Sequence, residues 1–215
     1  MNVELGGSVE GRPIVATRVG TLGPSLVVFG GIHGDEPESV TLCERFLATL
    51  EPSPHLTVWV LCAANPDGLA RLSKDNARGV DLNRNFAASN FSVDHAPGYF
   101  PGTTPLSEPE SRALIRLLDE AQPQLVVSVH QPFRCVNWDG PAHAVAEAMA
   151  AACGYPAVPS VGYPTPGSFG SFWGVDRGQP VITLELPRHL DERDWQGGLA
   201  ALDCARRSIT LSVGV

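Results

Sequence analysis

Four short apolar runs restrict the folds open to this chain. They are SLVVFGGI from Ser25, HLTVWVLC from His55, QLVVSVH from Gln124 and PVITLEL from Pro180. Each run is apolar at consecutive positions, which is typical of strands buried on both faces of a sheet. Segments with apolar residues at helical spacing separate the runs, so strands and helices alternate. The expected fold class is α/β: a single domain over residues 1–215, with a central mixed, mostly parallel β-sheet and helices on both faces.

Turn and capping residues indicate where the other elements begin. The first 25 residues, with their Gly-rich turns, predict short strands or a hairpin. Pro37 is expected at the first turn of a helix, and Ser107 with Glu110 resembles a capping box that opens another. Further helices are predicted over 142–152, near Ser168 and over 195–211. The stretch from 65 to 105 has no helical or strand period, and long loops of this kind are usually functional.

Polar residues stand where the predicted strands end. His33 and Glu36 follow the first apolar run, Asn65 follows the second, His130 ends the third and Glu185 interrupts the fourth. Ligands of open α/β sheets gather at the carboxyl ends of the strands. A catalytic zinc site commonly uses two His and one Glu and keeps a position open for water. The HxxE pair His33 and Glu36 therefore predicts a distant second His at the same edge.

Charge and composition exclude several classes of protein. The formal net charge is -8, and the Lys and Arg residues are scattered apart from a modest cluster at Arg71, Lys74, Arg78 and Arg84. We expect no nucleic-acid partner, which would need a basic surface, and a small anionic ligand instead. No apolar run approaches the roughly 18 residues of a transmembrane helix, so no membrane partner is expected. The oligomeric state is left open.

The cysteines and the N-terminus indicate a cytoplasmic protein. The five cysteines are odd in number and contain no CxxC pair, which is typical of reduced structural thiols. Cys135 is predicted to lie in a loop and to be the exposed one. The first residues lack the basic and apolar regions of a signal peptide, so a cytoplasmic location is expected.

Five motifs in order make the chain resemble the M14 zinc carboxypeptidases. They are HGDE (33–36), NPDG (65–68), RGVDLNRNF (78–86), the strand-end His130 and TLELP (183–187). Within that family, SEPES (107–111) and GYPTPGSFGSFW (162–173) are similar to the murein peptide amidases. Those enzymes cleave the γ-D-glutamyl bond to meso-diaminopimelate in cell-wall peptides. The resemblance therefore implies a zinc-dependent amidase whose substrate is a small peptide with a free carboxylate.

The resemblance also implies a role for each matching residue. One zinc ion per chain would be bound by His33, Glu36 and His130, and Glu185 would be the general base. Asn83 and Arg84 would bind the carboxylate of the leaving residue. Relatives commonly use an arginine to stabilise the oxyanion, and the matching position here is Lys74, with Arg71 and Arg78 as rivals.

Three further positions follow from the GYPTPGSFGSFW match. Tyr163 stands at the spacing of the family's mobile substrate-capping tyrosine. Gly170 and Ser171 correspond to the floor of the side-chain pocket, where small residues would leave room for a long polar side chain. The family often has a cis peptide just after the strand-end His, so a cis bond is predicted between Gln131 and Pro132.

Two other functions remain open from the sequence. An N-acyl amino acid hydrolase, of the desuccinylase or aspartoacylase kind, would share the zinc site. A catalytically inactive binding module would keep the fold, and the lysine at position 74 is the observation in its favour. The NPDG and VDLNRNF motifs favour the peptidase over the first alternative, and the retained Glu185 favours it over the second.

Overall fold

The four apolar runs form the central strands of an eight-stranded sheet in a computed structural model, which describes residues 1–211. The strands are β1 (Asn2–Gly7), β2 (Pro13–Val19), β3 (Ser25–Phe29), β4 (Thr57–Leu61), β5 (Leu125–His130), β6 (Phe133–Asp139), β7 (Ala157–Val158) and β8 (Val181–Pro187). Their order in the sheet is β1-β2-β4-β3-β5-β8-β6-β7. The pairs from β4 through β3 and β5 to β8 are parallel, and antiparallel pairs flank them. The predicted mixed α/β sheet is confirmed.

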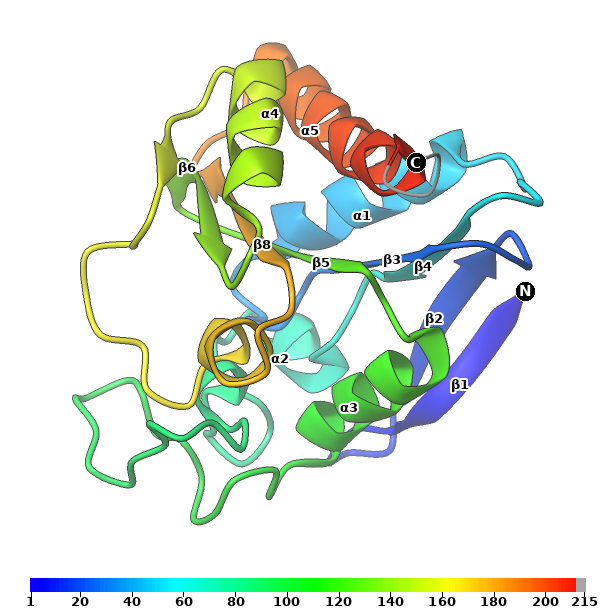
Figure 1. The fold of residues 1–215 in the computed structure, drawn as a ribbon. Helices are drawn as coiled ribbons and strands as arrows, with labels where there is room; N and C mark the ends of the chain where they lie inside the picture. The colour runs from blue at the N-terminus through cyan, green and yellow to red at the C-terminus, as the bar shows by residue number, and fades with distance from the viewer. Residues whose placement is uncertain (212–215) are drawn as a thin grey trace.

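Helices cover both faces of this sheet (Figure 1). They are α1 (Pro37–Thr49), α2 (Pro66–Arg71), α3 (Pro109–Ala121), α4 (His143–Cys153) and α5 (Glu192–Leu211), with the short helices η1 (Leu82–Arg84) and η2 (Gly170–Val175). α1, α4 and α5 pack on one face with Val127, Leu184 and other apolar residues of the central strands. α3 packs on the opposite face, against Val27 and Phe29. No helix within residues 1–211 is long and apolar enough to cross a bilayer.

The strand β6 was not predicted. It inserts between β8 and the two-residue β7, so Cys135 is 5% exposed and lies opposite Glu185. The prediction of an exposed loop cysteine was therefore wrong. One face of β6 borders a polar cavity, so polar residues stand on that face as well. The segment FRCVNWD therefore lacks the alternation of apolar and polar residues by which a strand is recognised in a sequence.

The predicted capping box at Ser107 and Glu110 was also wrong. α3 begins at Pro109, and Glu108 occupies the N-cap position without a capping hydrogen bond from its side chain. The residue before a proline avoids helical backbone angles, so Glu108 stays extended and the helix cannot begin earlier. Ser107 instead hydrogen bonds to Glu108, and Glu110 accepts a hydrogen bond from the backbone of Val9.

The stretch from 65 to 105 contains more structure than its sequence predicts. α2 begins directly after Asn65, whose side chain caps it by accepting from the Gly68 N–H, and η1 follows at 82–84. Asn65 is fully buried and also donates to the carbonyls of Ile32 and Lys74. It therefore fixes the loops around His33, and it does not line the cavity described below.

Candidate active site

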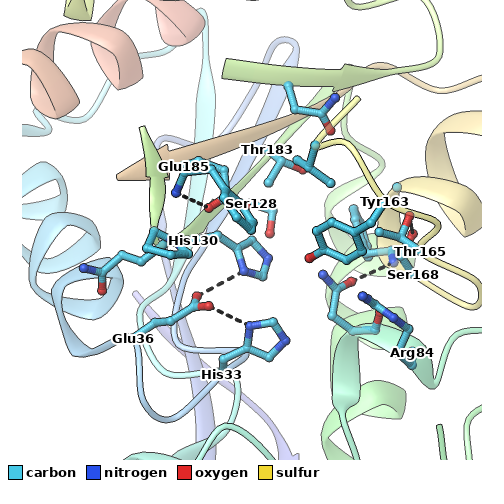
Figure 2. A pocket seen from close by; sticks show the side chains of 18 of the residues that line it. His33, Glu36, Arg84, Ser128, His130, Tyr163, Thr165, Ser168, Thr183 and Glu185 are labelled. Carbon is cyan, nitrogen blue, oxygen red and sulfur yellow. Dashed lines mark hydrogen bonds and ion pairs between the residues drawn. The ribbon is translucent and has the colours of Figure 1, made fainter. Parts of the chain in front are cut away.

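His33, Glu36 and His130 converge at the carboxyl edge of the sheet, as predicted (Figure 2). Glu36 Oε1 lies 2.8 Å from His33 Nδ1, and Oε2 lies 3.1 Å from His130 Nδ1. The two imidazole rings are 5.0 Å apart and meet edge to face. One donor atom from each residue lies within 4.8 Å of the others, and all three residues are buried.

The backbone around HGDE is held in place by small residues. Ser39, in the first turn of α1, accepts a hydrogen bond from the Gly31 N–H at 2.9 Å and donates to the Glu36 carbonyl at 2.6 Å. Gly34 packs directly on the backbone of Gly68, where a Cβ would overlap the carbonyl of that residue. A side chain at Gly34 would therefore displace the loop that carries His33 and Glu36.

Asp81 holds the other nitrogen of the His33 ring. Its Oδ1 lies 3.2 Å from His33 Nε2, and its side chain is completely buried. An imidazole that offers its Nδ1 lone pair carries its proton on Nε2, so Asp81 accepts that hydrogen and orients the ring. Asp81 was not among the predicted site residues, although it belongs to the VDLNRNF motif.

The electrostatics of the cluster favour a positive charge at its centre. Although burial by itself lowers the pKa of His33, the Glu36 and Asp81 carboxylates raise it to about 10. Burial raises the pKa of Glu36, but the two histidines lower it to about 2. A centre that attracts a proton this strongly also suits a divalent cation. Two imidazole nitrogens and one carboxylate are the donor set of a catalytic zinc, so these residues fit that metal.

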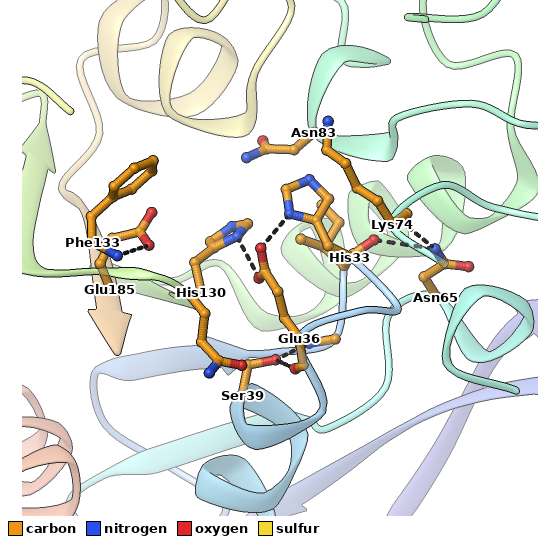
Figure 3. Close-up of polar contacts among 12 residues, drawn as sticks. His33, Glu36, Ser39, Asn65, Lys74, Asn83, His130, Phe133 and Glu185 are labelled. Atoms are coloured by element: carbon orange, nitrogen blue, oxygen red, sulfur yellow. Dashed lines mark hydrogen bonds and ion pairs between the residues drawn. The ribbon is translucent and has the colours of Figure 1, made fainter. Parts of the chain in front are cut away.

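Glu185 stands beside the cluster on β8. The β5–β8 register places it opposite His130, and it is 5% exposed. Its Oε2 accepts a long hydrogen bond, 3.4 Å, from the Phe133 N–H (Figure 3). Burial raises the pKa of this carboxyl group, and the charge of Glu36 raises it further against the opposing effect of His130. A carboxylate with a raised pKa beside a cluster of possible metal ligands is suited to accept and return a proton.

These residues open onto one cavity. His33, Glu36, His130 and Glu185 line one side, and Arg84 and Tyr163 lie on the other side (Figure 2). Asn83 also lines the cavity. The remaining lining includes Lys74, Tyr99, Ser128, Phe133, Asn137, Asp139, Thr165, Ser168, Gly170 and Thr183. Strands, loops and the short helix η1, distant from one another in sequence, therefore contribute to a single site.

Arg84 is a buried cation without a carboxylate partner. It is 4% exposed, Nη1 donates to the Asn83 carbonyl at 2.6 Å, and no carboxylate of residues 1–211 forms a salt bridge with it. Burying a charge is costly unless it is paired. The guanidinium also hydrogen bonds to Tyr163, and the donors that remain are available to an anion in the cavity. Asn83 accepts a hydrogen bond from the Phe169 N–H, which leaves its side-chain N–H groups for the same ligand.

Of the three candidates for the oxyanion donor, Lys74 alone lines the cavity. Arg71 pairs with Glu10, and Arg78 pairs with Glu108. Lys74 Nζ donates to Asp81 Oδ2 at 2.5 Å and to the Gly98 carbonyl at 2.8 Å. An ammonium group has three donors, so one remains for a ligand.

The other predicted positions differ in their location. Tyr163 lines the cavity, is 39% exposed and contacts the rings of Phe133 and Tyr99. Gly170 also lines the cavity, against the carboxylate of Asp139. Ser171 does not line it, because its hydroxyl is turned into hydrogen bonds with Ser168, Asn90 and the Thr165 carbonyl. The Gln131–Pro132 bond is cis, as predicted.

Comparisons with known sequences agree with the motif series. The zinc carboxypeptidase profile (Peptidase_M14) matches residues 2–140. Murein peptide amidase A of Escherichia coli K12 is 42% identical over 176 residues, which cover 76% of this chain and 71% of the relative. Murein peptide amidase A of Vibrio campbellii is 37% identical over 175 residues, which cover 75% and 68%.

Solved structures share the fold. The crystal structure of murein-tripeptide amidase MpaA from Escherichia coli O157 superposes with a TM-score of 0.80 at 33% identity, covering 97% of this chain and 91% of that one. Carboxypeptidase A from Helicoverpa armigera has a TM-score of 0.80 at 19% identity, covering 100% and 69%. At that identity the second match shows the shared fold alone.

Proposed function

Because this chain belongs to the zinc carboxypeptidase family, we propose that it hydrolyses the amide bond between γ-D-glutamate and meso-diaminopimelate in murein peptides. The observation that carries the reaction type is the meeting, in one cavity, of the His33–Glu36–His130 cluster, Glu185 and the unpaired Arg84. The similarity to murein peptide amidases supports the substrate.

One zinc ion per chain is part of the proposal, with His33, Glu36 and His130 as its ligands. A bound zinc supplies Lewis-acid chemistry, polarising a carbonyl oxygen and lowering the pKa of water towards about 7. Asp81 keeps the His33 ring oriented for that role, and Ser39 keeps the backbone of Glu36 in position.

Glu185 is proposed to carry the proton. It accepts a proton as the oxygen of water bonds to the carbonyl carbon, and it delivers that proton to the nitrogen as the carbon–nitrogen bond breaks. Its burial supports this role, because a carboxylate with a raised pKa accepts a proton more readily than an exposed one. Lys74 is proposed to stabilise the negative charge that develops on the carbonyl oxygen.

Arg84 and Asn83 are proposed to bind the free carboxylate of the leaving residue. The unpaired guanidinium supports this assignment, because a two-pronged contact with a carboxylate would satisfy its buried charge. Tyr163 stands beside Arg84 in the cavity wall and is proposed to cover the bound substrate. The predicted partner is thus a small peptide with a free carboxylate.

We also place this activity in the cytoplasm. The support is chemical: all five cysteines are free thiols, which is typical of a reducing compartment. Cell fractionation with an antibody against the chain would test the assignment, and recovery in a periplasmic or secreted fraction would overturn it.

A product assay tests the reaction. The zinc-loaded protein is incubated with L-Ala-γ-D-Glu-meso-diaminopimelate, and free diaminopimelate is measured by chromatography. Release is expected from this tripeptide and not from the tripeptide whose diaminopimelate carboxylate is amidated at the α-position. The Glu185→Gln variant is the matched control and should release none.

Two outcomes would replace the proposal. Hydrolysis of succinyl or acetyl amino acids without release of diaminopimelate would favour an N-acyl amino acid hydrolase. Binding of the tripeptide without turnover of any amide, by zinc-loaded protein, would favour a binding module.

A further inference from the structure

We propose that Tyr99 is a positioning residue whose ring holds the lysine and the arginine of the cavity, Lys74 and Arg84, where each meets the substrate. This inference rests on the proposed function, in which Lys74 stabilises the developing oxyanion and Arg84 binds the free carboxylate. Tyr99 itself stands outside every motif named above, in the stretch from 65 to 105 that has no sequence period.

The ring of Tyr99 contacts both basic side chains. Lys74 Nζ lies 3.8 Å from the ring centroid, and Arg84 Cζ lies 5.1 Å from it. A cation within about 6 Å of an aromatic centroid is attracted by the negative face of the ring, and the attraction is stronger where water is excluded. All three residues line the active-site cavity. One ring therefore links the proposed oxyanion donor to the proposed carboxylate site.

Lys74 needs such a support more than an arginine would. Its ammonium group ends a flexible four-carbon stem and has no planar fork to fix its direction. Asp81 Oδ2 and the Gly98 carbonyl accept hydrogen bonds from Nζ at 2.5 and 2.8 Å. An aromatic face is a much weaker acceptor than a carbonyl oxygen. The ring therefore restricts the stem, while the third N–H still prefers an oxygen of the substrate.

Arg84 gains a second support from the same ring. Lys74 and Arg84 carry like charges and repel each other, and the repulsion is stronger at a buried site than in water. The negative face of Tyr99 attracts both and offsets this repulsion. Arg84 also donates to the Asn83 carbonyl and hydrogen bonds to Tyr163, whose ring centroid lies 6.3 Å from that of Tyr99. Removing the Tyr99 ring would therefore let the two cations move apart.

The backbone on both sides of Tyr99 is held in place. The Gly98 carbonyl before it accepts the hydrogen bond from Lys74, and the Phe100 carbonyl after it accepts one from the Asp81 N–H at 2.8 Å. Asp81 stands three residues before Arg84 in the VDLNRNF motif. The ring is half-buried and is therefore fixed to the same segment as the arginine that it contacts.

Kinetics on the murein tripeptide test the role. Tyr99→Phe keeps the ring face, and Tyr99→Leu keeps an apolar side chain without one. Tyr99→Leu should lower kcat about 3- to 10-fold, through Lys74, and raise KM by a similar factor, through Arg84. Tyr99→Phe should keep both constants within about twofold of wild type. Phe100→Leu, at the next position and outside the cavity lining, is the matched control and should change neither.

A double variant separates positioning from general disruption. In a Lys74→Met background the oxyanion donor is already lost, so adding Tyr99→Leu should leave kcat unchanged while KM still rises. A further fall in kcat of the same size as in the single variant would assign the effect to disruption of the loop and overturn the inference. Equal losses in Tyr99→Phe and Tyr99→Leu would also overturn it, because the ring face would then not be the cause.

Two measurements need no turnover, and the first uses the fact that Lys74 is the only lysine of the chain. In zinc-loaded protein with carbon-13-labelled lysine, the ring current of Tyr99 should shift the single ε-methylene signal upfield in wild type and Tyr99→Phe, and not in Tyr99→Leu. Calorimetric titration with free meso-diaminopimelate should give a Kd about 3- to 10-fold higher for Tyr99→Leu than for wild type. An unshifted signal in wild type, or an unchanged Kd, would overturn the role of Tyr99. Absence of tripeptide hydrolysis with both differences intact would refute the proposed reaction while supporting Tyr99 as the residue that positions the two cations.

Discussion

His130 and Glu185 lie directly opposite one another on the parallel strands β5 and β8. One is a proposed metal ligand and the other is the proposed general base, so the backbone ladder sets their separation. Sites built on strands are held more rigidly than sites on loops. A conservative change at one of the two should therefore leave the other in position.

Glu185→Gln should abolish turnover while keeping the metal. The amide has nearly the shape of the carboxylate but cannot accept a proton, so kcat should fall by about 10² to 10⁴. Zinc content, measured by atomic emission after dialysis, should stay at the wild-type value. A variant that retained more than about a tenth of wild-type kcat would remove Glu185 from the proton-transfer role.

Asp81→Asn should weaken zinc binding. An amide in place of the carboxylate no longer holds the His33 Nε2–H firmly, and loss of such an orienting partner typically lowers metal affinity about 10- to 100-fold. Competition with a fluorescent chelator measures the change. Asp67→Asn is the matched control, because Asp67 is equally buried and does not line the cavity. Equal zinc affinity in the Asp81 variant and wild type would contradict the orienting role.

Much of this site could be predicted from the sequence because its residues belong to contiguous motifs or to strand ends. His33 and Glu36 are adjacent in one turn, and His130 and Glu185 end or interrupt apolar runs that were recognised as strands. Once those strands are parallel neighbours, the meeting of the four side chains follows from topology.

Asp139 and Ser128 could not be found in this way. Asp139 lies on β6, whose two faces border an apolar core and a polar cavity, so the strand has no readable period. Ser128 looks like an ordinary small residue within a buried strand, and its unpaired hydroxyl becomes evident only when the neighbours of the strand are known. The resemblance of the GYPTPGSFGSFW segment places Ser171 at the pocket floor, but in η2 its hydroxyl hydrogen bonds to the Thr165 carbonyl and the residue does not line the cavity.

Arg84→Lys should raise KM with little change in kcat. The lysine keeps a positive charge but loses the planar fork, so kcat/KM should fall about 10- to 100-fold for a substrate with a free carboxylate. Steady-state kinetics on the tripeptide and on its C-terminal amide separate the effects. Wild type should discriminate strongly between the two, and the variant weakly. If the variant lost the same factor on both substrates, Arg84 would not be the carboxylate site.

Removing the metal should lower thermal stability. The cluster concentrates buried groups that attract positive charge, and a cation that binds only the folded state stabilises it by about 2.7 kcal/mol at a free concentration 100 times Kd. Chelator-treated protein should therefore have a lower Tm, which zinc restores. A His130→Ala variant should show no such rise. An unchanged Tm on saturating zinc would argue against binding at this cluster.

Asp67, which lies outside the active-site cavity, should make the free energy of unfolding depend on pH. Burial by itself raises the pKa of Asp67, but hydrogen bonds from Ser8, the Glu10 N–H and Arg12 lower it below its ordinary value. A lowered folded-state pKa means that the ionised form stabilises the protein above the unfolded pKa of about 3.9. That stabilisation is lost as the pH falls through the lower, folded-state value.

Asp67→Asn isolates this contribution. Replacing the carboxylate should reduce the free energy of unfolding by about 1–3 kcal/mol at pH 7, because its donors lose a charged acceptor. Urea unfolding of wild type and variant should give a constant difference between about pH 5 and 8 and a smaller one below about pH 4. The contributions of the other titrating groups are the same in both proteins, so they cancel in the difference between the two free energies of unfolding. A difference that grew on acidification would require a raised folded-state pKa and would show that burial outweighs the three hydrogen bonds at this carboxylate.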